Sequence, residues 1–135
     1  MTKKRLGKTN LMVTAVGMGT YPMRLLRKKE GVELIKKVLA LGVNFIDTGN
    51  IYDDSEEKIG EAVKESRRED LIIASKSLAR DKKSFLEHVD LSLKRMAIDY
   101  IDIYYLHHVS SEKETSTSHG TGRSLRGTPR SDRKG

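Results

Sequence analysis

The sequence contains no cysteine and no tryptophan, only two prolines and two phenylalanines, and no long uncharged hydrophobic run. Without cysteine, the chain can form no disulfide, no thiolate zinc site and no iron–sulfur cluster of its own. No apolar stretch approaches the roughly 20 residues that cross a bilayer, so we expect no membrane association. The basic start, residues 1–10, leads into no apolar run of the kind found in secretory signals, and we therefore expect a cytoplasmic protein.

The net charge is positive, because 26 Lys and Arg oppose 19 Asp and Glu, which gives +7. Residues 111–135 carry six basic and three acidic side chains, so residues 1–110 carry the other 20 and 16. The basic residues alternate with acidic ones and have few aromatics among them, which is typical of a solvated surface. We expect no nucleic-acid partner, although binding of nucleic acid by the Arg-rich end of the chain is one alternative interpretation.

Strand and helix patterns alternate between residues 11 and 106. The segment 11–20 predicts a short hairpin, or a strand that ends in a turn at its glycines. Helical spacing of apolar residues is found over 29–41, 54–63 and 82–96, and short apolar strands are predicted over 43–46, 71–74 and 101–106. The predicted strand centres are about 28 to 30 residues apart, the length of one βα unit. Apolar strands joined by helices indicate an α/β fold with a parallel sheet.

The predicted helices also carry boundary signals. Gly42 stands where the first helix would be capped, and Asp54 stands three residues before Glu57, which is an N-cap signature. The apolar stripe of the third predicted helix consists of Leu86, Val89, Leu93 and Met96. After Ser110 the composition changes abruptly, and residues 111–135 contain a single large aliphatic side chain. We expect that segment to be disordered or a non-native appendage.

Ionisable residues stand at the carboxyl ends of three predicted strands: Asp47, Lys76 and His107. In a βα barrel this edge is the catalytic face. Taken singly, Asp47 could cap a helix, Lys76 could be a surface lysine and His107 a structural histidine. Tyr52, five residues after Asp47, could be a packing residue, or it could arch over the same edge.

Together these side chains have the chemistry of a proton donor. An ammonium at Lys76 would stabilise the phenolate form of Tyr52, and the Asp47 carboxylate would hold that lysine charged and oriented. Tyr52 could then donate a proton to a carbonyl oxygen as hydride arrives at the carbon. His107 would polarise and position that oxygen.

Four segments of the chain resemble the successive amino-terminal signatures of the aldo-keto reductases. They are RLGKTNLMVTAVGMGT, GVNFIDTGNIYDDSEEKIGEAV, LIIASKS and DYIDIYYLHHV, and the resemblance as a whole covers residues 4–110. The family's catalytic tetrad of Asp, Tyr, Lys and His falls on Asp47, Tyr52, Lys76 and His107. His107 rather than His108 takes the role, because the family pattern places the histidine five residues beyond an aspartate, which here is Asp102.

The resemblance implies a (β/α)8 TIM barrel enzyme that reduces an aldehyde or ketone with NADP(H), or alternatively NAD(H). It places Gly19, Thr20 and Asp47 at the cofactor and assigns no metal. At 135 residues, the chain is shorter than the about 250 residues of such a barrel, so residues 1–110 are expected to form its amino-terminal half. The family binds the adenosine phosphate largely through the second half, and we expect the chain by itself to be weakly active or inactive.

Within the family, the sequence most resembles the prokaryotic members that have a carboxyl-terminal iron–sulfur domain. This chain, however, has no cysteine with which to hold a cluster. Back-translation of residues 118–135 with suitable codons, read from the second base, can yield a helical segment like that of the family, which suggests a frameshift. The alternative to an enzyme is a non-catalytic half-barrel that binds a protein partner. The open edge of the expected sheet could also mediate self-association.

Overall fold

The computed structural model describes residues 1–110. The predictions made for residues 111–135, disorder or a shifted reading frame, lie outside the described residues. The described chain begins with an antiparallel hairpin of β1 (Lys3–Arg5) and β2 (Met12–Thr14). The segment 11–20 therefore supplies two strands, β2 of the hairpin and β3 (Met18–Gly19), and β1 is a strand that the sequence pattern did not reveal.

A four-stranded parallel sheet follows the hairpin. Its strands are β3 (Met18–Gly19), β4 (Phe45–Asp47), β5 (Ile72–Ser77) and β6 (Ile103–Leu106), and they lie side by side in chain order. All three pairings are parallel. The predicted α/β fold with about four parallel strands is confirmed.

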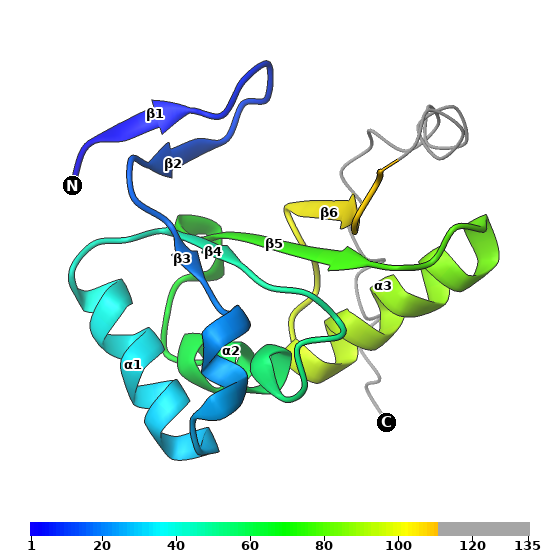
Figure 1. Ribbon diagram of the computed structural model, residues 1–135. Coiled ribbons are helices and arrows are strands. Elements are labelled where there is room, and N and C mark those ends of the chain that lie inside the picture. The colour runs from blue at the N-terminus through cyan, green and yellow to red at the C-terminus, as the bar shows by residue number, and fades with distance from the viewer. Residues whose placement is uncertain (111–135) are drawn as a thin grey trace, which may run out of the picture.

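Three helices cover one face of this sheet (Figure 1). They are α1 (Lys28–Ala40), α2 (Ser55–Val63) and α3 (Lys82–Met96), and the short 3-10 helices η1 (Tyr21–Leu25) and η2 (Arg68–Asp70) lie in the connections. The hairpin lies on the opposite side of the sheet (Figure 1). No described helix covers that second face, which in a closed barrel would face the interior.

The hydrophobic core lies between the sheet and the helices. Ile46 of β4 and Ile73 of β5 are paired in register and fully buried against Ile35 of α1 and Ile59 of α2. Because side chains alternate along a strand, the neighbours of Ile46 and Ile73 point to the other face. Asp47 and Lys76 therefore lie on the face that the helices leave uncovered.

The predicted strand over 71–74 was too short. The strand β5 runs to Ser77, because the residues from Ala74 to Ser77 pair with β6. Lys76 therefore lies within a strand rather than after it. By contrast, Asp47 ends β4 and His107 directly follows β6, as predicted.

Helix boundaries were predicted well and helix faces less well. The α3 bounds match the prediction, but Leu86 is 41% exposed, and Phe85 packs inward in its place. Gly42 follows the C-cap of α1 with φ of +85°, a left-handed conformation that suits glycine. Asp54 is the N-cap of α2, but its carboxylate makes no cap hydrogen bond and pairs instead with Lys58.

Two polar contacts hold the amino-terminal ends of the strands. Asn44, just before β4, accepts from the Thr14 backbone N–H through Oδ1 (2.7 Å) and donates to the Met12 carbonyl (2.9 Å), which fixes the hairpin to the sheet. Arg68 donates to the Asp102 carboxylate (2.6 Å), and the same carboxylate oxygen accepts from the Ile73 backbone N–H (2.9 Å). These contacts set the stagger of β4, β5 and β6 at the end opposite the predicted site.

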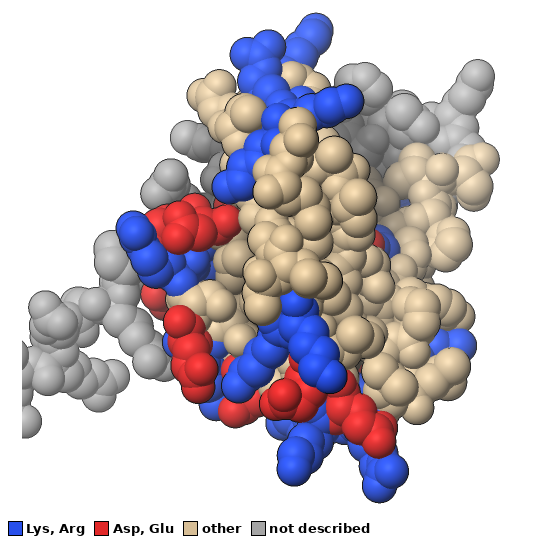
Figure 2. Space-filling model, turned by 90° about the vertical axis from the view of Figure 1, so that its left-hand side faces the viewer, with Lys and Arg blue, Asp and Glu red and all other residues tan. Residues whose placement is uncertain are grey.

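Charge is spread over several elements. Figure 2 shows Lys and Arg side chains over one end of the visible face, a mixture of both signs over the other end, and an uncharged band between them. The exposed basic residues of the hairpin are Lys3, Lys4, Arg5 and Lys8. Within residues 1–110, no helix is long and apolar enough to span a membrane.

The helices α2 and α3 touch at Gly60. A Cβ atom at this position would overlap the Met96 carbonyl oxygen and lie 2.7 Å from its carbon. The contact is made with backbone, which cannot rotate away as a side chain could. We predict that Gly60→Ala lowers the free energy of unfolding by about 2 kcal/mol, the range for overpacking a core.

Urea denaturation followed by circular dichroism measures this change. Gly19→Ala is the matched control, because a Cβ at Gly19 would meet nothing within 4 Å and should alter the free energy of unfolding by less than about 0.5 kcal/mol. Equal stabilities of the two variants would contradict the close approach of α2 to α3.

Candidate active site

The structure brings all four predicted catalytic residues to one edge of the parallel sheet. Asp47 is the last residue of β4. Lys76 lies one residue before the end of β5, where this strand pairs with β6, and His107 directly follows β6. Tyr52 lies in the loop between β4 and α2. Because the strands are parallel and adjacent, their carboxyl ends place these side chains within contact distance of each other.

An ion pair joins Asp47 and Lys76. The Lys76 ammonium donates a hydrogen bond to Oδ2 of the Asp47 carboxylate. The lysine side chain is 13% exposed and the aspartate side chain 37% exposed, so the pair is partly shielded from water. The contact holds the ammonium at this end of the sheet.

Tyr52 lies against this ammonium. Nζ of Lys76 is 5.0 Å from the centre of the Tyr52 ring, and Tyr52 is only 8% exposed. A side chain at Gly49 would crowd this approach, because its Cβ would lie 3.1 Å from Cγ of Lys76 and 3.2 Å from Cζ of Tyr52. The glycine in the loop thus lets the phenol and the ammonium come together.

Two rings make edge contacts with Tyr52. The Tyr21 ring lies 5.1 Å away, at 73° to it, and the His107 ring lies 5.9 Å away, at 81°. Such edge-to-face contacts are favourable between aromatic rings and fix the direction in which each ring points. Tyr52 is therefore held between η1 on one side and the end of β6 on the other.

His107 is anchored through its backbone and its ring. Its N–H donates to the Ser77 carbonyl (2.8 Å), and its carbonyl accepts from Arg80 (2.7 Å). The imidazole stacks on that of His108 at 4.2 Å. Burial, the neighbouring His108 and the Lys76 ammonium together hold the pKa of His107 below the usual 6.5 of histidine, so the ring is neutral at physiological pH.

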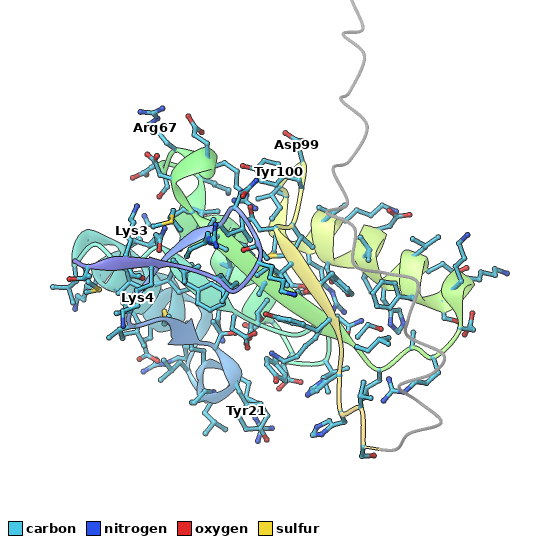
Figure 3. The ribbon with its side chains drawn as sticks, turned by 90° about the horizontal axis from the view of Figure 1, so that it is seen from above. Lys3, Lys4, Tyr21, Arg67, Asp99 and Tyr100 are labelled. Atoms are coloured by element: carbon cyan, nitrogen blue, oxygen red, sulfur yellow. The ribbon has the colours of Figure 1, made fainter. Side chains whose placement is uncertain are left out.

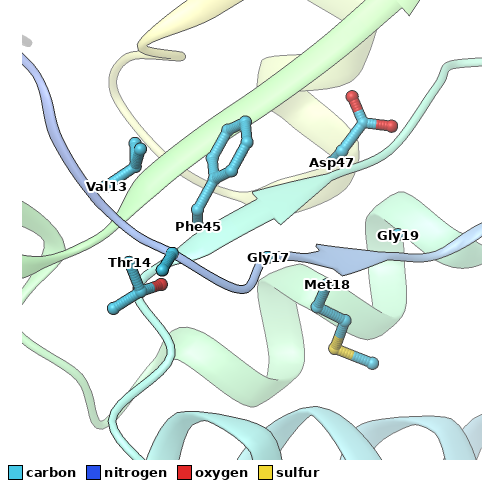
Figure 4. Close-up of a pocket in the computed structure, with 8 residues that line it drawn as sticks. Val13, Thr14, Gly17, Met18, Gly19, Phe45 and Asp47 are labelled. Atoms are coloured by element: carbon cyan, nitrogen blue, oxygen red, sulfur yellow. The ribbon is translucent and has the colours of Figure 1, made fainter. Parts of the chain in front are cut away.

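An open pocket of about 380 Å³ adjoins the site. Its walls come from β2, β3, β4 and their connections, and Figure 4 shows Phe45 and Asp47 pointing to the same side of β4 within it. Gly17 and Gly19 line it, whereas Tyr52, Lys76 and His107 do not. The pocket therefore adjoins the four predicted catalytic residues and shares only Asp47 with them.

The three residues predicted to bind cofactor differ in their surroundings. Gly19 borders open space. Asp47 reaches the same pocket and is paired with Lys76. Thr20 is fully buried, its N–H donates to the Asp47 carbonyl (2.9 Å), and its Oγ1 has no partner among the described residues. The Thr20 backbone thus supports Asp47, while its hydroxyl is not turned to the pocket surface.

The sequence analysis missed the polar support of the Tyr52 loop. Arg95 of α3 donates to the Asn50 carbonyl in that loop (2.7 Å) and contacts the buried carboxylate of Glu56 (3.4 Å). Glu56 in turn accepts from the hydroxyl of Ser75, next to Lys76 (2.8 Å). No local motif marks these residues, because 39 positions separate Arg95 from Glu56 and 45 separate it from Asn50.

A second missed residue is Lys58, whose side chain is 0% exposed. Its ammonium donates to the Met23 carbonyl (2.9 Å), the Leu26 carbonyl (2.8 Å) and the Asp54 carboxylate (2.6 Å). It therefore fastens η1, and with it Tyr21, to the start of α2. Among residues 1–110, no group of three His, Asp or Glu side chains is arranged to hold a metal ion.

Comparison with known proteins relates this geometry to one family. Residues 15–118 match the family described as "Aldo/keto reductase family". The uncharacterized oxidoreductase YqkF of Bacillus subtilis (strain 168) is 33% identical over 121 residues, which are 79% of this chain and 39% of that protein. L-galactose dehydrogenase of Arabidopsis thaliana is 33% identical over 127 residues, which are 81% of this chain and 40% of that protein.

Solved structures give the same result. The thermostable aldo-keto reductase Tm1743, determined with the inhibitor epalrestat, has a TM-score of 0.73 at 37% identity, over 79% of this chain and 43% of that chain. The holo form of aldo-keto reductase AKR11C1 from Bacillus halodurans has a TM-score of 0.69 at 31% identity, over 78% of this chain and 40% of that chain. The chain spans about two fifths of the length of the curated relatives it matches.

The stacked histidines generate a prediction about pH. Replacing His108 by glutamine removes one cause that lowers the pKa of His107, so the midpoint of His107 should rise toward 6.5. The proton NMR signal of the His107 ring, followed against pH, measures it. In the unsubstituted protein the folded state resists protonation, so stability falls as pH drops below 6.5, and His108→Gln should reduce that loss. An unchanged or lower midpoint would contradict the stacked arrangement.

Proposed function

The chain belongs to the aldo/keto reductase family, and on this premise we propose that it supplies the proton-donating part of an NAD(P)H-dependent reductase of aldehydes or ketones. The observation that carries the proposal is the contact of the Lys76 ammonium with both the Asp47 carboxylate and the Tyr52 ring. It supports the prediction that the family's tetrad falls on Asp47, Tyr52, Lys76 and His107. The activity, substrates and partners of the whole protein are part of the proposal.

Tyr52 is the proposed general acid. Its phenol gives its proton to the carbonyl oxygen of the substrate as that oxygen gains negative charge. The phenolate that remains is stabilised by the Lys76 ammonium 5.0 Å from the ring centre. Asp47 keeps this ammonium at the sheet edge, so the positive charge is in place before the reaction begins.

His107 is the proposed orienting residue for the same oxygen. The pKa of its imidazole lies below the usual value, so the ring is neutral and can donate a hydrogen bond from Nε2. The edge contact with Tyr52 holds the two rings next to each other, with their centres 5.9 Å apart. A carbonyl oxygen bound there would accept from the phenol and from the imidazole together.

We place the nicotinamide end of NAD(P)H beside Gly19 and Asp47, the part of the pocket that lies at the carboxyl ends of the strands. The rest of the pocket lies on the face that would be the packed interior of a closed barrel. A Cβ atom at Gly19 would meet nothing within 4 Å, so this end of the pocket is open. When bound, the cofactor supplies the hydride. Gly19 and Asp47 would face it, whereas Thr20 contributes through its backbone contact with Asp47.

Several finer assignments remain predictions. They include the preference for NADP(H) over NAD(H), the cytoplasmic location, the absence of a nucleic-acid partner, and self-association through the open edges of β3 and β6. The non-catalytic half-barrel gains no support from the structure, since the tetrad residues are assembled rather than scattered. We therefore propose an enzymatic function and not a scaffold function.

The proposed role of Tyr52 predicts the effect of removing one hydroxyl group. Tyr52→Phe should lower kcat/KM for reduction of 4-nitrobenzaldehyde by NADPH at least about 100-fold, the contribution of a positioned general acid. The dissociation constant of NADPH should change by less than about twofold. The first quantity is measured from the loss of NADPH absorbance, and the second from NADPH fluorescence.

Tyr21→Phe is the matched control, because it removes the same hydroxyl from the ring that packs against Tyr52. It should keep kcat/KM within about fivefold of the unsubstituted protein. Equal losses in the two variants would show that Tyr52 does not donate the proton. No oxidation of NADPH with 4-nitrobenzaldehyde by the unsubstituted chain would agree with the weak or absent activity expected of residues 1–110 alone, and would refute an activity of this chain by itself.

A further inference from the structure

Arg24, in the last turn of η1, lies over the ring of Tyr21. Its Cζ atom is 4.5 Å from the ring centre, and its NH2 group donates to the phenol oxygen of Tyr21 (3.0 Å). A stacked and hydrogen-bonded guanidinium has fewer accessible rotamers than a free one, so its charge is held in one place. Tyr21 thus fixes the position of Arg24.

Tyr21 places this charge on the rim of the candidate active site. The Tyr21 ring meets the Tyr52 ring edge-on at 5.1 Å, so the guanidinium lies within about 10 Å of the centre of the proposed proton donor. Figure 3 shows Tyr21 at one end of the molecule and Arg67, Asp99 and Tyr100 at the other. The Arg24 charge is therefore at the catalytic end of the sheet.

The charge of Arg24 is not neutralised within the described part of the chain. No carboxylate of residues 1–110 forms an ion pair with it, whereas nearby Arg27 pairs with Glu30 (3.2 Å). The carboxylates of Asp47 and Asp54, on either side of Tyr52 in the chain, are already paired with Lys76 and Lys58. The rim near Tyr21 thus presents a guanidinium whose outer N–H groups can still bind an anion.

We infer that Arg24 selects substrates, and that the preferred substrate of this site is a carbonyl compound with an anionic group at the end remote from the carbonyl. The planar guanidinium fork binds a carboxylate or a phosphate with two parallel hydrogen bonds. The remote anion would meet Arg24 while the carbonyl lies between Tyr52 and His107. This inference rests on the proposed function, since it assigns the substrate class of that site.

Binding by the intact chain tests the inference without requiring turnover. The probes are 4-(hydroxymethyl)benzoate and its methyl ester, which have the same ring and differ in the negative charge. Each is titrated into the 15N-labelled protein, and the amide signals of Tyr21 and Tyr52 are followed by NMR. The acid should bind more tightly than the ester. Arg24→Gln should raise the dissociation constant of the acid by about two- to fivefold, the range for an exposed ion pair.

Arg27→Gln is the matched control, because it removes an equal charge only three residues from Arg24. The Arg27 side chain is 88% exposed. Arg27→Gln should leave the affinity for the acid unchanged, and neither substitution should affect the ester. If both substitutions weakened binding of the acid equally, the effect would come from the net charge of the protein and not from Arg24, and the inference would be overturned. A lack of preference for the acid, or no shift of the Tyr21 and Tyr52 signals with either probe, would overturn it as well.

The two proposals fail in different ways. If the chain binds the acid through Arg24 but does not oxidise NADPH, the anion site is supported and the proposed reaction is refuted for this chain. If the chain reduces charged and uncharged aldehydes equally well, and Arg24→Gln has no effect, the reaction is supported and the proposed substrate class is refuted.

Discussion

The arrangement of the site depends on the parallel register between β4 and β5. Asp47 pairs with Ala74, so Lys76 extends two residues beyond the end of β4 and points to the same face as Asp47. A shift of one residue would turn Lys76 toward the helices and leave the Asp47 carboxylate without its cation. The ion pair and the closeness of Tyr52 to the ammonium both follow from this register.

The register is held by polar contacts at both ends of the strands. At the amino-terminal end, Asp102 accepts from Arg68 and from the Ile73 backbone, so β5 and β6 share one carboxylate. At the other end, Arg95 reaches from α3 to the loop that carries Tyr52. Buried charges cost free energy unless they are paired, and here the pairs lie where they fix strands and loops in place. The helical layer therefore supports the site as well as covering the core.

The sequence predicted the parts of this structure that depend on local pattern. The spacing of strands and helices predicted a parallel sheet and the edge on which Asp47, Lys76 and His107 meet, and the position of Tyr52 in the next loop, together with the family resemblance, predicted it as their partner. The sequence did not predict that Phe45 lines the pocket, that Leu86 is exposed, or that Lys58 is buried. Those outcomes depend on which elements pack together, and a single amphipathic pattern is compatible with several arrangements of neighbours.

Geometry and enclosure are separate requirements at this site. The four strands and three helices suffice to place the phenol, the ammonium, the carboxylate and the imidazole, because each is held by contacts within residues 1–110. They do not enclose these groups, since no described helix covers the face of the sheet on which Asp47 and Tyr105 lie, and Tyr105 is 40% exposed. Exclusion of water strengthens the electrostatic contacts on which proton and hydride transfer depend. Under the proposed function, the register of the strands therefore places the reacting groups, and the exposure of that face to water weakens the electrostatic contacts between them.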